Sequence, residues 1–130
     1  MSILRVISRG LLAALMIGAG VMHFVRPGFF LKIVPPYVPY HREVVYLSGV
    51  CEIALGLLLL IPRYRRLAGW GIIALLIAVF PANIYVYQHQ EIVPASPALH
   101  LFRLVLQWVF ILMAYWQTKS SGATGGAADC

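Results

Sequence analysis

Four long apolar segments dominate this sequence, at residues 10–25, 44–61, 67–87 and 98–116. They hold between 16 and 21 residues each. A helix of about 20 apolar residues, rising 1.5 Å per residue, crosses the ~30 Å hydrocarbon layer of a bilayer. The segments therefore predict an all-α fold, namely a four-transmembrane-helix bundle.

The composition agrees with a membrane location. The 130 residues are 62% hydrophobic and only 11% charged, which leaves too little polar surface to coat a water-soluble domain of this size. We expect residues 1–118 to form a single four-helix transmembrane domain. Residues 119–130 are rich in Gly, Ala and Ser and lack periodicity, which predicts a disordered cytoplasmic tail.

The first apolar segment admits a second interpretation. Arg5 and Arg9, followed by apolar residues 11–20, imitate the charged and apolar regions of a secretory signal peptide. No clear small-residue cleavage site follows, and removal of the segment would leave three spans. We therefore favour a membrane span that reaches back to Leu4, with both arginine side chains extending toward the membrane surface.

The basic residues predict the orientation. With four spans, both termini share a side with the loop between the second and third spans. That side carries six basic residues (Arg5, Arg9, Arg63, Arg65, Arg66 and Lys119), and the other side carries three (Arg26, Lys32 and Arg42). The positive-inside rule then places both termini in the cytoplasm. Because these charges are dispersed among short loops, we expect no nucleic-acid partner.

Two charged residues lie inside the apolar segments, Glu52 in the second and Arg103 in the fourth. A charge within the membrane costs about 2.5–3.5 kcal/mol on insertion scales, so it usually faces the bundle interior and finds a partner. The topology places Glu52 about 12 Å and Arg103 about 8 Å below the outer surface. We expect an ion pair between Glu52 and Arg103. A structural pair that sets helix register and a functional pair both remain open.

Other polar residues fall at a similar depth. Gln107 lies about 14 Å below the outer surface, on the same helix face as His100 and Arg103. His23 and Asn83 come near the outer ends of spans that run in the opposite direction. Their coincidence in one layer predicts one site in the outer half of the bilayer. Its expected members are His23, Ser48, Glu52, Asn83, Arg103 and Gln107.

Each member of this site also has a structural interpretation. Asn83 and Gln107 can serve as ordinary hydrogen bonds between helices, or to a backbone carbonyl that Pro81 leaves unpaired. His23 can contact lipid headgroups at the membrane surface, or carry a proton or donate to a ligand carbonyl. These alternatives stay open on the sequence alone.

Small residues predict where helices pack closely, and Ser96 with Pro97 predicts where the fourth span begins. Small side chains at four-residue intervals suit close approach of two helices, as at Ser48 and Gly56 around Glu52 and at Gly10, Ala14 and Gly18 in the first span. Ser96 is a candidate N-cap, and Pro97 then occupies the first helical position of the fourth span.

Residues 26–42 form the longest connection and combine four prolines with Phe29, Phe30, Tyr37 and Tyr40. This segment is too apolar for a free loop and too short to span. One interpretation places it in the outer headgroup layer, over the polar cluster. The other makes it an aromatic belt that anchors the protein.

The order and spacing of several short motifs resemble the DoxX family of small four-helix membrane proteins. The motifs are His23-Phe24 with Pro27, Ile33-Val34-Pro35 with Pro39, Ser48-Gly49-x-x-Glu52-x-x-x-Gly56, Pro62, Pro81-Ala82-Asn83 and Arg103-x-x-x-Gln107-Trp108. They cover nearly the whole chain apart from the tail. The resemblance implies a bacterial or archaeal membrane protein, here in the bacterial inner membrane. It further implies relatives that act as quinone-linked subunits of sulfur-compound oxidation, as partners of redox enzymes or as membrane assembly factors.

We hypothesise a ligand pocket that opens toward the outer leaflet. Arg103 and Gln107 present donors, Glu52 holds Arg103 and exchanges a proton, and His23 and Asn83 complete the polar rim. Such a site suits a small amphipathic molecule with one carbonyl or hydroxyl end, for example a quinone or an isoprenoid-like lipid. Redox participation rests on the resemblance alone, and the sequence assigns no reaction.

The alternative hypothesis is a non-catalytic scaffold or assembly factor for a larger membrane enzyme or receptor. In that case lipid-facing surfaces, including Trp70, Trp108 and the small residues of the first span, contact a protein partner or a second copy. A transporter is disfavoured because the chain shows no inverted repeat and no pair of broken helices.

Metal and disulfide chemistry find little support. His23, His41, Glu52, His89 and His100 are the available metal ligands, and no two lie at ligand spacing within one helix, so we predict no metal site. Cys51 lies in the outer half of the predicted membrane and Cys130 ends the predicted cytoplasmic tail, so the two cannot meet to form a disulfide. Cys51 is then a small buried residue or a lone thiol that acts with a partner.

Overall fold

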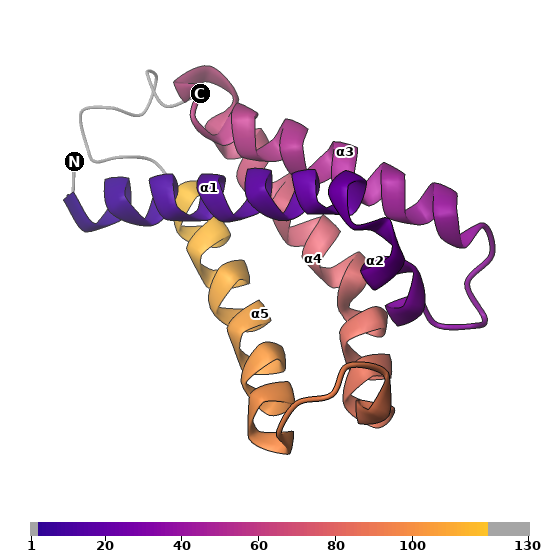
Figure 1. Ribbon diagram of the computed structural model, residues 1–130. Helices are drawn as coiled ribbons and strands as arrows, with labels where there is room; N and C mark the ends of the chain where they lie inside the picture. Colours follow the sequence, from indigo (N-terminus) through magenta and orange to yellow (C-terminus); the bar gives the residue numbers. More distant parts are fainter. Residues whose placement is uncertain (1–2, 120–130) are drawn as a thin grey trace.

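The computed structural model describes residues 3–119, and this part of the chain contains only helices and their connections (Figure 1). The elements are α1 (Ile3–Val25), α2 (Pro27–Ile33), α3 (His41–Leu59), η1 (Pro62–Tyr64), α4 (Arg65–Gln88), η2 (Gln90–Ile92) and α5 (Pro97–Gln117). The all-α prediction is confirmed. The predicted disordered tail, apart from Lys119, lies outside the described residues.

Three helices are long and apolar enough to cross a membrane: α1, the Pro62–Gln88 stretch that contains α4, and α5. The fourth long helix, α3, has only 19 residues and carries Arg42, Glu43 and Glu52, which lower its hydropathy. By this measure the chain is a membrane protein with three candidate spans. Helix α3 can cross the membrane as well only if its three charged side chains lie at the membrane surface or against other helices instead of lipid.

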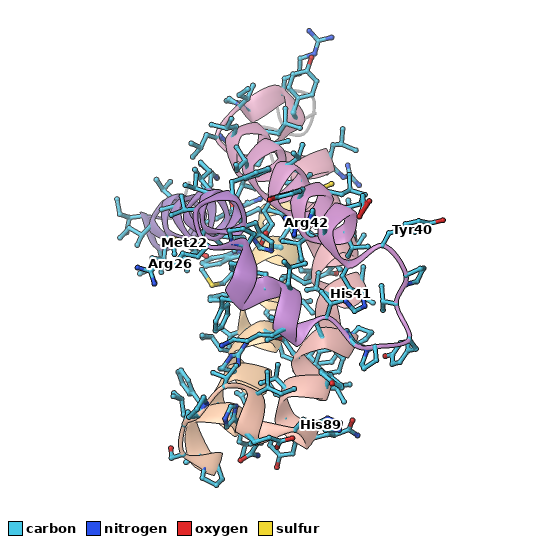
Figure 2. The ribbon with its side chains drawn as sticks, turned by 45° about the vertical axis from the view of Figure 1, so that its right-hand side comes forward. Met22, Arg26, Tyr40, His41, Arg42 and His89 are labelled. Carbon is cyan, nitrogen blue, oxygen red and sulfur yellow. The ribbon has the colours of Figure 1, made fainter. Side chains whose placement is uncertain are left out.

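The four long helices form two crossed pairs. Helix α1 packs along α3, and α4 packs along α5. In Figure 1, α1 runs across the top of the molecule at a steep angle to α5. In Figure 2, turned by 45°, α1 is seen nearly end-on while α4 and α5 extend downward. The axes therefore do not share the common direction that a simple up-and-down bundle would have.

Glycines allow α1 and α3 to approach closely. A Cβ atom added to Gly20 would lie 2.7 Å from the carbonyl oxygen of Gly49, and one added to Gly56 would lie 3.1 Å from that of Ala13. The close approach predicted around Gly56 is present. Such contacts exclude larger residues, because an added methyl group would meet backbone.

The predicted seam of Gly10, Ala14 and Gly18 does not pack within the chain. A Cβ atom at Gly10 or Gly18 would have nothing within 4 Å beyond its own helix, and Ala14 is exposed. The face of α1 that packs inward carries Leu12, Met16 and Gly20 instead. The small residues of the seam thus face the surroundings of the molecule.

The buried core is small and draws on all four long helices. Its members are Leu12, Ala13, Met16, Leu59, Ala68, Ile72 and Ala114. Many large apolar side chains stay outside, among them Leu47 (65% exposed), Ile77 (56%) and Leu112 (66%). An apolar outer surface of this extent suits lipid surroundings and would be a liability in water.

The first turns of α1 are tied to the end of α5. Arg9 donates from Nε to the side-chain oxygen of Gln117 at 2.9 Å, and Gln117 donates to the carbonyl of Arg5 at 3.1 Å. The Arg5 guanidinium donates to the carbonyl of Lys119. Both arginines are buried, so their side chains pack against the end of α5 within the protein. Cations are favourable here because carbonyl groups at a helix C-terminus lack partners and carry partial negative charge.

Helix α5 begins as the sequence predicts. The Ser96 hydroxyl accepts a hydrogen bond from the backbone N–H of Leu99 at 3.3 Å, and Pro97 is the first helical residue. The longest connection contains an element that the sequence does not predict, the seven-residue helix α2. The chain then turns through residues 34–40 to Tyr40, which has φ 56° and projects outward beside α3 (Figure 2).

Candidate ligand-binding cavity

A cavity of about 640 Å³ lies between the helices, with walls from α1, α2, α3, α4 and α5 and from residues 34–38. Most of its lining is aliphatic or aromatic, including Leu15, Phe29, Val44, Leu75 and Phe110. Ligand sites in proteins typically measure about 300–1,000 Å³ and combine apolar walls with a few placed polar groups. This cavity has the size and the character of such a site.

All six residues of the predicted site line this one cavity. They are His23 from α1, Ser48 and Glu52 from α3, Asn83 from α4, and Arg103 and Gln107 from α5. Polar residues from four helices, as distant in sequence as His23 and Gln107, thus share one space. How they pair there differs from the prediction.

Glu52 contacts a histidine. Its Oε2 atom lies 3.0 Å from Nδ1 of His23. The same Nδ1 atom lies 2.7 Å from the carbonyl oxygen of Ala19. Because a carbonyl oxygen only accepts, Nδ1 carries the hydrogen and donates a hydrogen bond to the Ala19 carbonyl. The Glu52 oxygen has no aligned hydrogen bond, so its contact with the imidazole is electrostatic.

The predicted ion pair between Glu52 and Arg103 is absent from the structure of residues 3–119. Arg103 lines the cavity, half-buried, and makes no ion pair, hydrogen bond or aromatic contact with any described residue. The reason lies in the helix pairing. Glu52 is directed toward α1, against which α3 packs, and α5 packs along α4 instead.

Asn83 and Gln107 join α4 to α5. Asn83 donates from its side-chain amide to the side-chain oxygen of Gln107. Gln107, which is buried, donates in turn to the carbonyl oxygen of Leu76 at 2.8 Å, in the turn before Pro81. The Asn83–Gln107 bond is the hydrogen bond between helices that the sequence allows for these two residues, whereas the carbonyl that Pro81 leaves without a backbone donor is that of Ile77, one residue after Leu76. The Gln107 donor is therefore already engaged.

Comparison with known proteins adds a family but no activity. A family model described as a domain of unknown function, DUF8561, matches residues 12–118. The chain belongs to the DUF8561 family. No curated protein and no solved structure matches it. The matched region contains all six predicted site residues, so the cavity lies within the DUF8561 domain.

Helix α2 closes one side of the cavity over the polar cluster. Phe30 stacks on the His23 ring with centroids 3.8 Å apart and an interplanar angle of 16°. Phe29 packs edge-on against Phe30, and both line the cavity together with Tyr37. Residues 29–38 thus contribute to the cavity lining, and Phe30 covers His23; a place in the outer headgroup layer stays a prediction. No periodicity in so short a segment would have revealed α2 itself.

The other histidines considered as metal ligands do not come together in one place. His100 is 2% exposed, lies outside the cavity lining, and has no hydrogen-bond partner for either ring nitrogen among residues 3–119. His41 is the first residue of α3, and Figure 2 shows His89 well below it, near the lower end of the molecule. No group of three or more metal-ligating side chains occurs in the described part of the chain. Cys51 is a half-buried free thiol in the cavity lining, and Cys130 falls outside the described residues.

Proposed function

We propose that this DUF8561 member is a multi-pass protein of the bacterial cytoplasmic membrane, with all four long helices in the bilayer and both termini cytoplasmic. Three helices meet the length and hydropathy of a span, and the charge of Glu52 on α3 is directed at another helix instead of lipid. Transmembrane helices tilt by up to about 40°, so pairs tilted in opposite senses cross steeply. The crossed arrangement is therefore compatible with four spans.

We propose further that the protein binds a small amphipathic ligand in the cavity. The observation that carries this proposal is the gathering of six polar side chains in the lining of one largely apolar space of about 640 Å³. An apolar chain or ring can occupy the region of Leu15, Leu75 and Phe110. A polar end can then meet the side chains of Ser48 and Arg103. Quinone-like and isoprenoid-like molecules both have this two-part character.

Association with redox enzymes is a separate part of the proposal. It rests on the motif order shared with DoxX proteins, and no side chain of the cavity is assigned a catalytic role. Cys51 is a half-buried free thiol in the cavity lining, and the proposal gives it no redox role.

The test is to identify the small molecules that the protein retains. The full chain is purified in mild detergent, and its organic extract is examined by mass spectrometry. Two alanines of α4 give a matched pair of variants: Ala82 lines the cavity, and Ala74 is exposed outside it. We expect Ala82→Phe to lose a retained amphipathic molecule that the unchanged protein and Ala74→Phe keep. Identical extracts from all three proteins would contradict a ligand site in this cavity.

The alternative function, a non-catalytic membrane scaffold, is favoured by one observation on α1. Gly10, Ala14 and Gly18 face outward with open space above the two glycines, a pattern that suits a neighbouring helix in a membrane. Gentle purification discriminates between the two functions. A stoichiometric protein partner or second copy that is lost in Ala14→Phe supports the scaffold, and a retained lipid or quinone supports the pocket.

A further inference from the structure

The charged groups of the cavity are unevenly satisfied. Its lining contains three side chains that carry or readily gain charge near neutral pH: His23, Glu52 and Arg103. The first two lie against each other, with Nδ1 and Oε2 3.0 Å apart. Arg103 has no ion pair, hydrogen bond or ring contact with any residue from 3 to 119. One cation is therefore left over in a largely apolar space.

The neutral side-chain amides of the cavity, by contrast, already have hydrogen-bond partners. The Asn83 amide donates to Gln107, and the Gln107 amide donates to the Leu76 carbonyl. A neutral polar end, such as a quinone carbonyl, can accept a hydrogen bond from Arg103 but leaves the positive charge of the guanidinium uncompensated in a largely apolar space. A negatively charged end accepts from the same N–H donors and also offsets that charge.

On these grounds we infer that the ligand of the cavity is a single-chain amphipath with an anionic head, a carboxylate or a phosphate, which Arg103 binds. This inference rests on the proposed function and specifies the chemistry of its ligand. The planar guanidinium binds either anion through two parallel hydrogen bonds. The Ser48 hydroxyl, on the same lining and without a hydrogen-bond partner among the described residues, is available as an additional donor.

The rest of the cavity fits the apolar part of such a molecule. Its volume of about 640 Å³ accommodates a drug-sized ligand, and its walls run from Leu12 and Leu15 of α1 to Leu106 and Phe110 of α5. Only Glu52 contributes a negative charge to the lining, and its carboxylate is held on the α1 side by His23.

The experiment compares three probes with the same chain length: dodecanoate, dodecyl phosphate and the neutral dodecanol. Each is titrated into the purified full chain in a non-ionic detergent, and bound probe is counted by native mass spectrometry. A hydrogen bond to a charged group corresponds to a difference in affinity of about 10- to 100-fold. We expect at least one anion to bind about that much more tightly than dodecanol. Preference for dodecanoate would point to a fatty acid, and preference for dodecyl phosphate to a lipid phosphate.

Variants at Arg103 decide whether this side chain is responsible. Arg103→Met and Arg103→Gln should both remove the preference for anions and leave dodecanol binding unchanged, while Arg103→Lys should keep most of the preference. Arg66→Met is the matched control, because Arg66 is exposed and lies outside the cavity lining. Arg103→Met and Arg103→Gln differ in polarity, so a change that prevents one from folding need not affect the other. One folded variant of the two is enough for the test.

The outcomes separate this inference from the proposed function. If dodecanol binds as tightly as both anions, and Ala82→Phe abolishes binding of all three, the cavity binds amphipaths but the anionic head is refuted. A preference for anions that survives in Arg103→Met or Arg103→Gln also refutes it. If no probe binds to the folded protein, both the inference and the proposed function fall.

Discussion

Glu52 of α3 and His23 of α1 face each other within one turn of the Gly20–Gly49 contact, with Oε2 and Nδ1 3.0 Å apart. This contact joins the two most extensively packed helices through their polar groups. It also takes the carboxylate away from Arg103. Which cation Glu52 meets is thus decided by the close approach of α1 and α3.

The first prediction concerns this choice of partner. We expect a double-mutant cycle of His23→Phe and Glu52→Gln to give a coupling free energy of about 0.5–3 kcal/mol, because the two side chains are in contact. The cycle of Glu52→Gln with Arg103→Met should give a coupling close to zero. Stability is measured by unfolding in detergent, monitored by circular dichroism. A larger coupling for Glu52 with Arg103 than with His23 would contradict the pairing described here.

A second prediction follows from the glycine contacts. Gly49→Ala should destabilise the protein by about 1–3 kcal/mol, because the added methyl group would lie 2.8 Å from Cβ of His23 and 3.0 Å from the carbonyl oxygen of Gly20. Gly18→Ala is the control, since its Cβ would have nothing within 4 Å outside its own helix. It should be neutral or slightly stabilising, because alanine favours a helix by about 0.5–1 kcal/mol. Equal effects of both changes on the unfolding midpoint would argue against the close packing of α1 on α3.

Much of the fold follows directly from the sequence. Helical structure is predicted for the four apolar segments because their length and hydropathy leave no other stable form in a membrane. The sequence predicts that the six polar residues of the cavity, from His23 to Gln107, share one region, because polar side chains in apolar helices avoid lipid and turn toward one another. That argument specifies a common region without specifying partners.

The pairings depend on helix rotation and crossing, which the sequence does not encode locally. Glu52 lies three residues from Gly49, so the contact of Gly49 with α1 turns the carboxylate toward His23. Burial of Arg9 likewise depends on the end of α5 lying beside α1, a contact between residues 108 positions apart. The short helix α2 is not predictable either, since seven residues form a marginal helix unless they pack on other elements.

A third prediction tests the link between α4 and α5. Gln107→Leu removes the bonds to Asn83 and to the Leu76 carbonyl and should destabilise the protein by about 0.6–2 kcal/mol, the range found for polar contacts between membrane helices. Gln88→Leu, at the exposed end of α4, should change stability by less than about 0.5 kcal/mol. The comparison is made by thermal unfolding in detergent. A Gln107→Leu protein as stable as Gln88→Leu would show that this link contributes nothing.

The last prediction concerns Tyr40, the one non-glycine residue with positive φ among residues 3–119. Its φ of 56° and ψ of 54° place it in the left-handed region, which costs most side chains about 1–2 kcal/mol, while asparagine tolerates this region and is also a favoured N-cap. Tyr40 is 74% exposed and precedes α3, so little packing is lost on substitution. We therefore expect Tyr40→Asn to stabilise the protein by about 1 kcal/mol, seen as a higher midpoint of thermal unfolding. Tyr37→Asn, at an equally exposed position with negative φ, is the control and should give no gain. A loss of stability in Tyr40→Asn would mean that the Tyr40 ring itself supports the turn before α3.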